Sequence, residues 1–481
     1  MKLKQVGFFL GPLLFVAFRL IPGPTVITVD AWKVLALGVL MLVWWITEAV
    51  PIPVTAILPM IFLPILGIYD LKTAAAPYAN PIVYLFMGGF MLALAMEKWN
   101  LHRRIALNIV KITGTNANGI ILGFMVATGF MSMWISNTAT TIMMLPIALS
   151  VIDLLTSQSR GPSSKGIRYF SLSIMLGIAY AANIGGTATI IGTPPNVVFA
   201  AFMLETYQIE MTFAKWIVLG LPFAIILISI AYFLIVKVIF PTRLGNFEEA
   251  GPLIEGQIRA LGKMSLGEKR TLIIFLLTAF SWVFRSKING WVDWLELSDT
   301  SIALLSTLAL FMVPVNFKEN LFVLDWKATE KLPWGILLLF GGGLSLAGAL
   351  YEVGLVDYVG SFFEGKDNFG FLIAIGLTAV SLFLTEVISN VALVSIFLPV
   401  VGGIAIGLGI SPLLICIPVT LAASCAFMLP MSTPPNAIVF ASGHLSVTQM
   451  AKAGLLINII AILLIALFNQ TLVLWLFQAN G

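Results

Sequence analysis

The stretch MWISNTATTIMMLP at residues 133–146 decides the fold, because a related stretch, EVISNVALVSIFLP, occupies residues 386–399. Each stretch places an adjacent Ser and Asn inside an apolar run and ends in Leu-Pro, and the copies lie 253 positions apart. Polar pairs in apolar surroundings are costly unless they have partners. Their repetition therefore indicates a repeated structural unit with a polar centre.

The composition of the chain is that of a membrane protein. Of its 481 residues, 59% are hydrophobic and 10% are charged, and the mean hydropathy is +1.03. A soluble domain does not bury so much apolar surface. Apolar runs such as 35–47, 119–135, 216–240 and 453–468 are continuous, which favours helices over the alternating strands of a membrane barrel. The sequence predicts an all-α polytopic protein of the lipid bilayer, with no separate soluble domain.

The two halves of the chain repeat each other beyond the Ser-Asn pairs. FMGGFMLALAMEKWNL at 86–101 aligns with FGGGLSLAGALYEVGL at 340–355, and GTPPN at 192–196 aligns with STPPN at 432–436. We predict a first half at 1–240, a linker at 241–270 and a second half at 271–481. If each half crosses the membrane an odd number of times, the copies are inverted and two copies of one site meet near the midplane. This is the architecture of an inverted-repeat transporter.

The basic residues predict the orientation in the membrane. The linker contains Arg243, Arg259, Lys263, Lys269 and Arg270, so the positive-inside rule places it in the cytoplasm. Lys2 and Lys4 place the N-terminus on the same side. The apolar run that follows them has no cleavage site and is interpreted as the first membrane helix. The C-terminus is then expected outside.

The repeated motifs lie where helices are expected to break. A Ser-Asn pair can cap a half-helix through its side-chain oxygens, and the paired prolines of TPPN prevent a helix from continuing through them. Half-helix N-termini would offer N–H groups to an anion, and unwound carbonyls would offer oxygen to a small cation. The alternative is that these residues only bond between packed helices. We favour a binding site because both motifs occur twice.

The nature of the ligand follows in part from which side chains are absent. Apart from Glu386, neither motif contains an ionisable residue, so the polar groups are amides, hydroxyls and backbone. Neutral oxygen ligands suit Na⁺, and a bound Na⁺ would offset the charge of an adjacent carboxylate. The sequence predicts Na⁺ as the coupling ion for an anionic substrate. The net charge of +4 is modest, and no basic cluster with interleaved aromatic residues indicates a nucleic-acid partner.

These motifs resemble those of the divalent anion/sodium symporters. The resemblance extends over nearly the whole chain and rests on five stretches: WWITEAVPIPVTAILP at 44–59, SNTATTIMMLP at 136–146, GGTATIIGTPPN at 185–196, TEVISNVA at 385–392 and FMLPMSTPPNAIVFASGH at 427–444. It implies about eleven membrane helices and two re-entrant hairpins. It also implies a homodimer in which a transport domain moves like an elevator against a scaffold domain.

The resemblance assigns roles to positions of this chain. Substrate contacts fall on Ser136, Asn137, Thr138, Ser389, Asn390, Val391, Thr193 and Thr433. Cation contacts for Na⁺ fall on Ser132, Ser136, Asn137 and Gly192 in the first half, and on Thr385, Ile388, Asn390 and Ser432 in the second. Gly192 and Ile388 would contribute backbone carbonyls. Val391 departs from the threonine of many bacterial relatives and leaves one substrate contact without a hydroxyl.

Other polar residues have more ordinary interpretations. Glu48 lies between a Trp pair and two prolines, which favours a helix end near the interface over a proton relay. Glu386 is expected near the site without being a substrate ligand. His102 and His444 are interpreted as ordinary polar residues rather than proton shuttles. Cys416 and Cys425 lie in apolar sequence and indicate neither a disulfide nor a zinc site.

Together with the neutral oxygen ligands of the motifs, the resemblance implies Na⁺-coupled symport of C4-dicarboxylates such as succinate, malate and fumarate. Within carriers, the alternatives are an Na⁺-independent exchanger of dicarboxylates or of citrate for succinate, and a sulfate carrier. A channel is less favoured, because inverted repeats with breaks at the midplane are typical of alternating access. No nucleophile–base pair, zinc-protease motif or nucleotide-binding loop is present in the sequence, which argues against an enzyme or a primary pump.

Overall fold

Helices account for most of the fold. The computed structural model describes residues 2–158, 165–242, 244, 250–292, 294–366 and 369–478. Across these residues the only strands are β1 (Pro314–Asn316) and β2 (Leu321–Phe322), which form one short antiparallel pair. The predicted all-α class is therefore confirmed.

The elements of the first half are α1 (Lys2–Leu20), α2 (Val29–Thr47), α3 (Ile52–Thr55), α4 (Leu58–Ile65), α5 (Leu71–Ala75), η1 (Ala76–Ala79), α6 (Pro81–Lys98), α7 (Leu101–Ile112), α8 (Ala117–Ser132), α9 (Asn137–Gln158), α10 (Lys165–Gly186), α11 (Pro194–Tyr207), α12 (Phe213–Phe233) and η2 (Leu234–Ile239). Those that follow are α13 (Ala250–Ala260), α14 (Leu266–Trp291), α15 (Asp299–Met312), η3 (Trp326–Lys331), α16 (Trp334–Glu352), α17 (Leu355–Ser361), α18 (Gly370–Leu384), α19 (Asn390–Gly407), α20 (Leu413–Ala423), α21 (Pro434–Ala441), α22 (Val447–Phe468), η5 (Asn469–Val473) and α23 (Leu474–Gln478).

The length and hydropathy of these helices suit a bilayer. In the described part of the chain, 10 helical segments are long and apolar enough to cross a membrane, and shorter apolar helices such as Ala117–Ser132 and Gly370–Leu384 accompany them. Large apolar side chains such as Phe9 (72% exposed) and Leu277 (60% exposed) lie on the outside, as lipid contact requires. The chain is a multi-pass membrane protein.

The internal repeat is visible in the backbone and in the packing. Asn100 and Gly354 are equivalent positions, and both adopt the left-handed conformation just before α7 and α17. Phe86 of α6 and Phe340 of α16 are also equivalent, and their rings meet edge to face with centroids 5.2 Å apart. Two equivalent residues that touch must lie at the axis that relates the copies. The Trp99 indole donates to the Val323 carbonyl at 2.7 Å, which places the end of α6 beside the segment before α16. The two helices therefore run in opposite directions.

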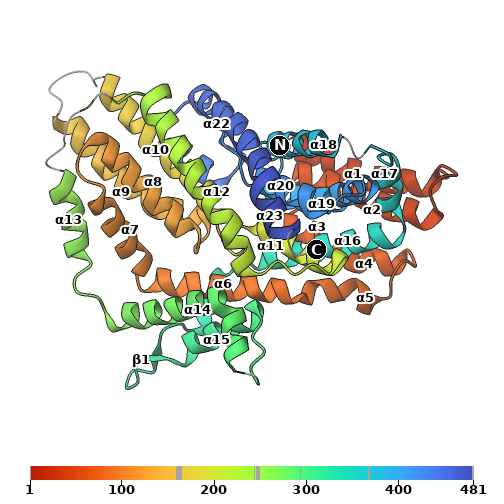
Figure 1. The fold of residues 1–481 in the computed structure, drawn as a ribbon, viewed down its shortest axis with the longest axis horizontal. Coiled ribbons are helices and arrows are strands. Elements are labelled where there is room, and N and C mark those ends of the chain that lie inside the picture. Colours follow the sequence, from red (N-terminus) through yellow and green to blue (C-terminus); the bar gives the residue numbers. More distant parts are fainter. Residues whose placement is uncertain are drawn as a thin grey trace.

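Each repeat contains a helical hairpin whose tip lies inside the protein. The first hairpin joins α8 to α9 through residues 133–136, and the second joins α18 to α19 through residues 385–389. The two hairpins lie toward opposite ends of the long axis of the molecule, with α10, α11 and α20 between them (Figure 1). Opposed hairpins bring the two Ser-Asn pairs toward the centre.

Each repeat also contains an interrupted helix beside its hairpin. The break between α10 and α11 covers residues 187–193, and the break between α20 and α21 covers residues 424–433. Thr193 and Thr433 are the N-cap residues of α11 and α21, and the paired prolines occupy the first helical positions. Proline is favoured there because its missing N–H would have no partner in the helix. The TPPN motifs thus begin the second half-helices.

The predicted linker contains helix α13 and the start of α14. α13 is held against the amphipathic helix α7 by an ion pair between Lys111 and Glu255 at 2.8 Å. Arg104 of α7 also pairs with Glu268 at the start of α14, at 2.7 Å. Arg243, one of the basic residues used to predict orientation, lies outside the described residues. The linker is therefore packed against the first half along part of its length.

Candidate functional site

A cavity of about 740 Å³ lies where the two hairpin tips meet the two interrupted helices. The volume is typical of small-molecule sites, which span roughly 300–1,000 Å³. All the residues predicted to contact substrate line this cavity: Ser136, Asn137, Thr138, Thr193, Ser389, Asn390, Val391 and Thr433. The structure therefore brings together side chains that are up to 297 positions apart in the sequence. Gly192, Ile388 and Ser432, predicted to contact Na⁺, also line it.

The walls of the cavity are neutral. Phe86, Phe90, Trp134, Leu339 and Met431 contribute apolar surface, and Glu48 is the only ionisable side chain among the described lining residues. A bound dianion would therefore meet hydroxyl, amide and N–H groups but no fixed positive charge. Charge at such a depth is costly without compensation. The electrostatics of the cavity favour an anion that arrives with cations.

A cluster of oxygen atoms lies behind the first hairpin tip. The Ser132 hydroxyl lies 2.6 Å from the Oδ1 of Asn137 and 2.7 Å from the carbonyl oxygen of Ala182. A hydroxyl has only one hydrogen to donate, so it cannot satisfy both acceptors at once. Three oxygens at such short separations are suited to share a small cation. Thr189 adds a contact nearby by donating to the Met133 carbonyl at 2.6 Å.

The same cluster is repeated behind the second hairpin tip. The Thr385 hydroxyl lies 2.7 Å from the Oδ1 of Asn390 and 2.7 Å from the carbonyl oxygen of Ala423. Thr385 is fully buried, as is Ser132 in the first cluster. The predicted cation contacts at Ser132, Asn137, Thr385 and Asn390 thus fall into two equivalent groups. The carbonyls of Ala182 and Ala423, which complete the groups, were not predicted.

The two cation contacts predicted on the unwound segments, Gly192 and Ser432, differ in their surroundings. Gly192 packs so tightly that an added Cβ would lie 2.5 Å from the Gly186 carbonyl oxygen, so only glycine fits there. The Ser432 hydroxyl donates to the Leu429 carbonyl at 2.7 Å and accepts from Asn436 at 2.9 Å. Its side chain is therefore engaged within its own segment.

The final Asn of each TPPN motif holds its unwound segment in shape. Asn196 donates to the Thr189 carbonyl at 2.8 Å, and Asn436 donates to the Ala426 and Leu429 carbonyls at 3.1 Å each. Both side chains are fully buried. Backbone carbonyls freed by a break in a helix must find donors, and these amides supply them. The motif therefore fixes the shape of the broken segment as well as starting the next helix.

The predicted capping by the Ser-Asn pairs is correct for one hairpin and wrong for the other. The Ser136 hydroxyl accepts from the Ala139 N–H at 3.2 Å, as an N-cap does. Ser389 is the N-cap of α19 but makes no side-chain capping bond. Asn137 and Asn390 turn toward Ser132 and Thr385 instead of capping. The side chains of the second pair are thus directed to the oxygen cluster and the cavity.

Glu386 follows Thr385 but points away from the cavity. Its carboxylate accepts from the backbone N–H groups of Phe427, Met428 and Leu429 at 2.8, 2.9 and 3.1 Å, and from Asn458 at 2.8 Å. It is 3% exposed. The carboxylate therefore orders the broken segment of the second repeat.

Glu48 lies at the end of α2, where it adopts the left-handed conformation and pairs with Lys4 at 3.1 Å. Both side chains are more than half exposed, at 57% and 61%. Exposed pairs of this kind contribute little to stability. The structural interpretation of Glu48 as a helix-end residue agrees with this position, although its side chain also borders the cavity.

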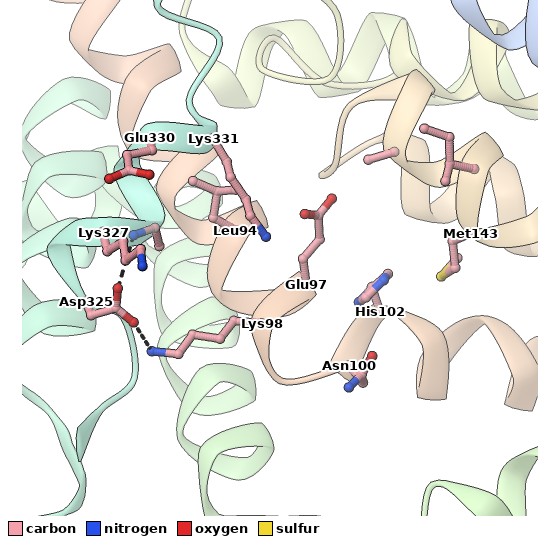
Figure 2. Close-up of a pocket in the computed structure, with 13 residues that line it drawn as sticks. Leu94, Glu97, Lys98, Asn100, His102, Met143, Asp325, Lys327, Glu330 and Lys331 are labelled. Atoms are coloured by element: carbon pink, nitrogen blue, oxygen red, sulfur yellow. Dashed lines mark hydrogen bonds and ion pairs between the residues drawn. The ribbon is translucent and has the colours of Figure 1, made fainter.

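A second crevice, of about 860 Å³, lies beside the first turns of α9 and is lined by Glu97, Lys98, His102 and residues of η3 (Figure 2). Lys98 and Asp325, which both line it, form an ion pair at 2.6 Å (Figure 2). His102 Nδ1 lies 2.9 Å from the Met96 carbonyl, and burial lowers the pKa of its ring below the usual value. A neutral histidine that bonds to backbone agrees with the ordinary role predicted for it.

Both acidic and basic side chains line this second crevice, and neither Ser-Asn pair does. His444 lines neither cavity. Over the described part of the chain, no group of three or more His, Cys, Asp or Glu residues is arranged to hold a metal ion. The cavity between the hairpin tips is the candidate site.

Comparison with known proteins gives one family over almost the whole chain. Residues 4–478 match the family described as the sodium:sulfate symporter transmembrane region. The sodium-dependent dicarboxylate transporter SdcS of Staphylococcus saprophyticus is 40% identical over 476 residues, covering 98% of this chain and 91% of that protein. The transporter of the same name from Staphylococcus aureus (strain USA300) is 40% identical over 468 residues, covering 96% and 90%.

Solved structures share the fold at low identity. The YdaH transporter of Alcanivorax borkumensis aligns with a TM-score of 0.54 at 14% identity, over 90% of this chain and 97% of that one. MtrF of Neisseria gonorrhoeae aligns with a TM-score of 0.53 at 13% identity, over 99% of this chain and 95% of that one. These likenesses agree with a transporter fold.

Proposed function

Because the chain belongs to the sodium:sulfate symporter family, we propose that it is a secondary carrier that couples Na⁺ to the uptake of C4-dicarboxylates such as succinate, malate and fumarate. The family and the relatives named above are transporters, so the protein is not an enzyme. The sodium-dependent dicarboxylate transport named for those relatives supports both the ion and the substrate class.

The duplicated oxygen clusters support Na⁺ coupling most directly. Ser132 and Thr385 each lie within 2.7 Å of two oxygen acceptors, and both clusters adjoin a cavity whose described walls lack a basic residue. Na⁺ bound in both clusters would supply positive charge on either side of a dianion. The proposed order of binding is Na⁺ first and dicarboxylate second.

The arrangement of donors supports a substrate with two carboxylates. Ser136, Asn137 and Thr138 come from one hairpin, whereas Ser389 and Asn390 come from the opposed hairpin, and all line one cavity. Two separate groups of donors suit the two ends of a C4-dicarboxylate. A single tetrahedral anion such as sulfate would contact one group at a time.

We propose that transport proceeds by an elevator movement within a homodimer, as the family resemblance implies. α12 packs against α8, α10 and α22, so it is assigned with them to the moving transport domain. α14 packs against α6 and α15, which are assigned to the scaffold. The Ser-Asn pairs and the TPPN threonines that line the cavity come from both repeats and are assigned to the transport domain, so they can move as one unit. Phe86 and Phe90 of α6 would then form a scaffold wall of the cavity.

We propose that the cavity opens toward the cytoplasm, with the N-terminus inside and the C-terminus outside the inner membrane. We assign its mouth to the part lined by Glu48, Pro333 and Gly335, near the start of α16, because the Glu48 side chain is more than half exposed. The segment before α16 adjoins the end of α6 through Lys98 and Asp325, and the following helix α7 is tied to the linker. The mouth therefore lies on the same side as the linker, whose basic residues favour the cytoplasm.

The decisive experiment is uptake of radiolabelled succinate into liposomes that contain the purified protein, with Na⁺ or K⁺ outside. We expect uptake to require Na⁺, to saturate with succinate and to be inhibited by unlabelled malate and fumarate. Equal uptake in Na⁺ and K⁺, together with counterflow driven by internal dicarboxylate, would identify an exchanger instead. Inhibition by sulfate but not by malate would identify a sulfate carrier. Large unitary currents in planar bilayers would identify a channel.

A further inference from the structure

Asn183 of α10 makes a buried connection between the two repeats. Its Nδ2 donates to the Thr433 hydroxyl oxygen at 3.0 Å and to the Ala426 carbonyl at 3.1 Å, and its side chain is 1% exposed. Asn183 belongs to the first repeat, whereas Thr433 and Ala426 belong to the unwound segment of the second. Asn183 and Thr433 both line the cavity. Neither the Ser-Asn nor the TPPN motif predicted this connection.

The chemistry of these contacts fixes the direction of the Thr433 hydroxyl. A backbone carbonyl can only accept, so the Asn183 amide must present its NH₂ group toward Ala426 and hence toward Thr433. The Asn436 N–H also donates to the Thr433 oxygen, at 3.4 Å. Both lone pairs of that oxygen are then engaged, and its hydrogen is left to donate. Among the described residues, no protein group accepts that hydrogen.

Among the described residues, the first repeat has no equivalent of the hydrogen bond from Asn183 to Thr433. Ala182 and Ala423 occupy equivalent places in the two oxygen clusters, so the next residues, Asn183 and Ser424, are also equivalent. The buried Ser424 hydroxyl has no hydrogen-bond partner among the described residues. Thr193, the counterpart of Thr433, makes no side-chain capping bond. The two TPPN threonines are therefore chemically different despite identical motifs.

We propose that Asn183 is a positioning residue that holds the Thr433 hydroxyl as a donor toward the substrate carboxylate at the second-repeat end of the cavity. This deepens, and rests on, the proposed dicarboxylate transport. That end of the cavity contains Val391, which has no hydroxyl to offer, so a directed Thr433 hydroxyl supplies a donor there. An ionised carboxylate carries no hydrogen, so both of its oxygens can accept such a bond.

The test compares variants in the liposome uptake assay by their half-saturating succinate concentration. Thr433→Val removes the hydroxyl at nearly constant shape and is expected to raise that concentration roughly tenfold or more, as loss of a bond to a charged group does. Asn183→Asp turns the donor into an acceptor, so the Thr433 hydrogen would be drawn toward residue 183. We expect a rise of similar size from this change. The half-saturating Na⁺ concentration should change by less than about twofold in Thr433→Val.

The double variant separates positioning from a general structural effect. If Asn183 acts through Thr433, Asn183→Asp adds less than about twofold in the Thr433→Val background, whereas independent effects would multiply. If Asn183→Asp does not fold, as judged by its thermal transition, Asn183→Ala replaces it in the same cycle with a smaller expected rise. Ser424→Ala is the matched control, because it removes the equivalent side chain and should leave the half-saturating succinate concentration unchanged.

Two failures can be told apart in this experiment. Wild-type uptake that needs Na⁺, combined with an unchanged half-saturating succinate concentration in Thr433→Val, would overturn the positioning role and leave the proposed function standing. Multiplicative effects in the double variant would overturn it as well. Absence of Na⁺-dependent dicarboxylate uptake by the wild-type protein would overturn the proposed function, and the role of Asn183 with it.

Discussion

The Asn458 amide donates a hydrogen bond of 2.8 Å to the carboxylate of Glu386, which joins α22 to the tip of the second hairpin. The same carboxylate accepts from three consecutive backbone N–H groups in the broken segment that begins at Phe427. In the first repeat the equivalent position is Met133, which has no charge. The residues beside the two oxygen clusters therefore differ, because a buried carboxylate follows Thr385 in the second repeat and an uncharged methionine follows Ser132 in the first.

We predict that Glu386→Gln weakens Na⁺ binding and lowers thermal stability. An amide can turn only one acceptor atom toward the four donors, so at least one N–H of the segment would face an NH₂ group. A buried donor left in this way costs about 1–3 kcal/mol. The measurements are the Na⁺ dependence of succinate uptake and the thermal transition of the detergent-solubilised protein.

Asn458→Ala provides the comparison, because it removes one donor and leaves the three backbone bonds intact. We expect a smaller loss of stability and a smaller shift in Na⁺ dependence than in Glu386→Gln. Wild-type Na⁺ dependence in both variants would show that the carboxylate does not support the second oxygen cluster.

We predict that Ser132→Ala and Thr385→Val each raise the half-saturating Na⁺ concentration, and that their effects are similar. Each change removes the hydroxyl at the centre of one oxygen cluster. Two cation sites should make uptake depend on Na⁺ sigmoidally, and the loss of one site should make that dependence less steep. Na⁺ titrations of uptake at fixed succinate measure both quantities.

Ser381→Ala is the control for Thr385→Val. The Ser381 hydroxyl lies one turn earlier on α18 and donates to the Val419 carbonyl of α20 at 3.0 Å, whereas Thr385 donates to Ala423. Loss of this bond should cost about 1 kcal/mol of stability without changing the Na⁺ dependence. If Ser381→Ala and Thr385→Val shift the Na⁺ dependence equally, the effect of Thr385→Val is structural.

The parts of the site that repeat in the sequence could be predicted from it. Ser136 and Ser389 begin equivalent half-helices because their motifs are equivalent, and inversion of the repeats brings both into one cavity. Thr193 and Thr433 follow from TPPN in the same way. The all-α class followed from the continuous apolar runs, because a helix satisfies its backbone N–H and C=O groups within its own segment in lipid.

The parts that depend on backbone atoms and on differences between the repeats were not predictable. The carbonyls of Ala182 and Ala423 have no signature in an apolar sequence, because any residue can supply a carbonyl. The bond from Asn183 to Thr433 joins residues 250 positions apart that belong to different repeats, so alignment of the repeats cannot reveal it. Ser389 shows the reverse case, because its motif predicted a cap that its side chain does not make.

We predict that cross-linking α14 to the segment before α12 stops transport. Arg285 of α14 pairs with Glu210 at 2.9 Å and with Asp299 at 3.2 Å, and Asp299 accepts from the Phe213 N–H at 2.6 Å. In an elevator these contacts join scaffold and transport domain and must separate in each cycle. Cysteines at positions 210 and 285, joined through disulfide bonds by a short bifunctional methanethiosulfonate reagent, should block uptake until those disulfides are reduced.

The cross-linking variants are made in a protein that lacks both native cysteines. Cys416 and Cys425 form no disulfide and are buried, but replacing them ensures that the reagent reacts only at the introduced pair. A cysteine pair at positions 98 and 325 is the control, because Lys98 and Asp325 also form an ion pair but lie within the proposed scaffold. Its cross-link should leave uptake intact. Uptake that continues through a complete 210–285 cross-link would contradict movement at this boundary and favour rocking of other elements.

We predict that Thr138 and Val391, equivalent positions of the two hairpins, differ in function as they differ in chemistry. Both line the cavity, but only Thr138 has a hydroxyl to donate to a carboxylate. A hydrogen bond to a charged group is worth roughly 1.5–3 kcal/mol, so Thr138→Val should raise the half-saturating succinate concentration about tenfold or more. Asn137→Ala and Asn390→Ala should abolish uptake, because each amide would contact both substrate and Na⁺.

Val391→Thr tests the other hairpin at nearly constant shape. Val391 is 9% exposed, so a new hydroxyl there must find an acceptor in the cavity or remain unsatisfied. We expect a modest change for succinate, with any gain greatest for malate or citrate, whose additional oxygens can accept the bond. The measurement is the half-saturating substrate concentration of each variant, at fixed Na⁺ in liposomes of matched protein content. If Thr138→Val has no effect while Val391→Thr abolishes uptake, the carboxylate that we assign to the first hairpin binds at the second.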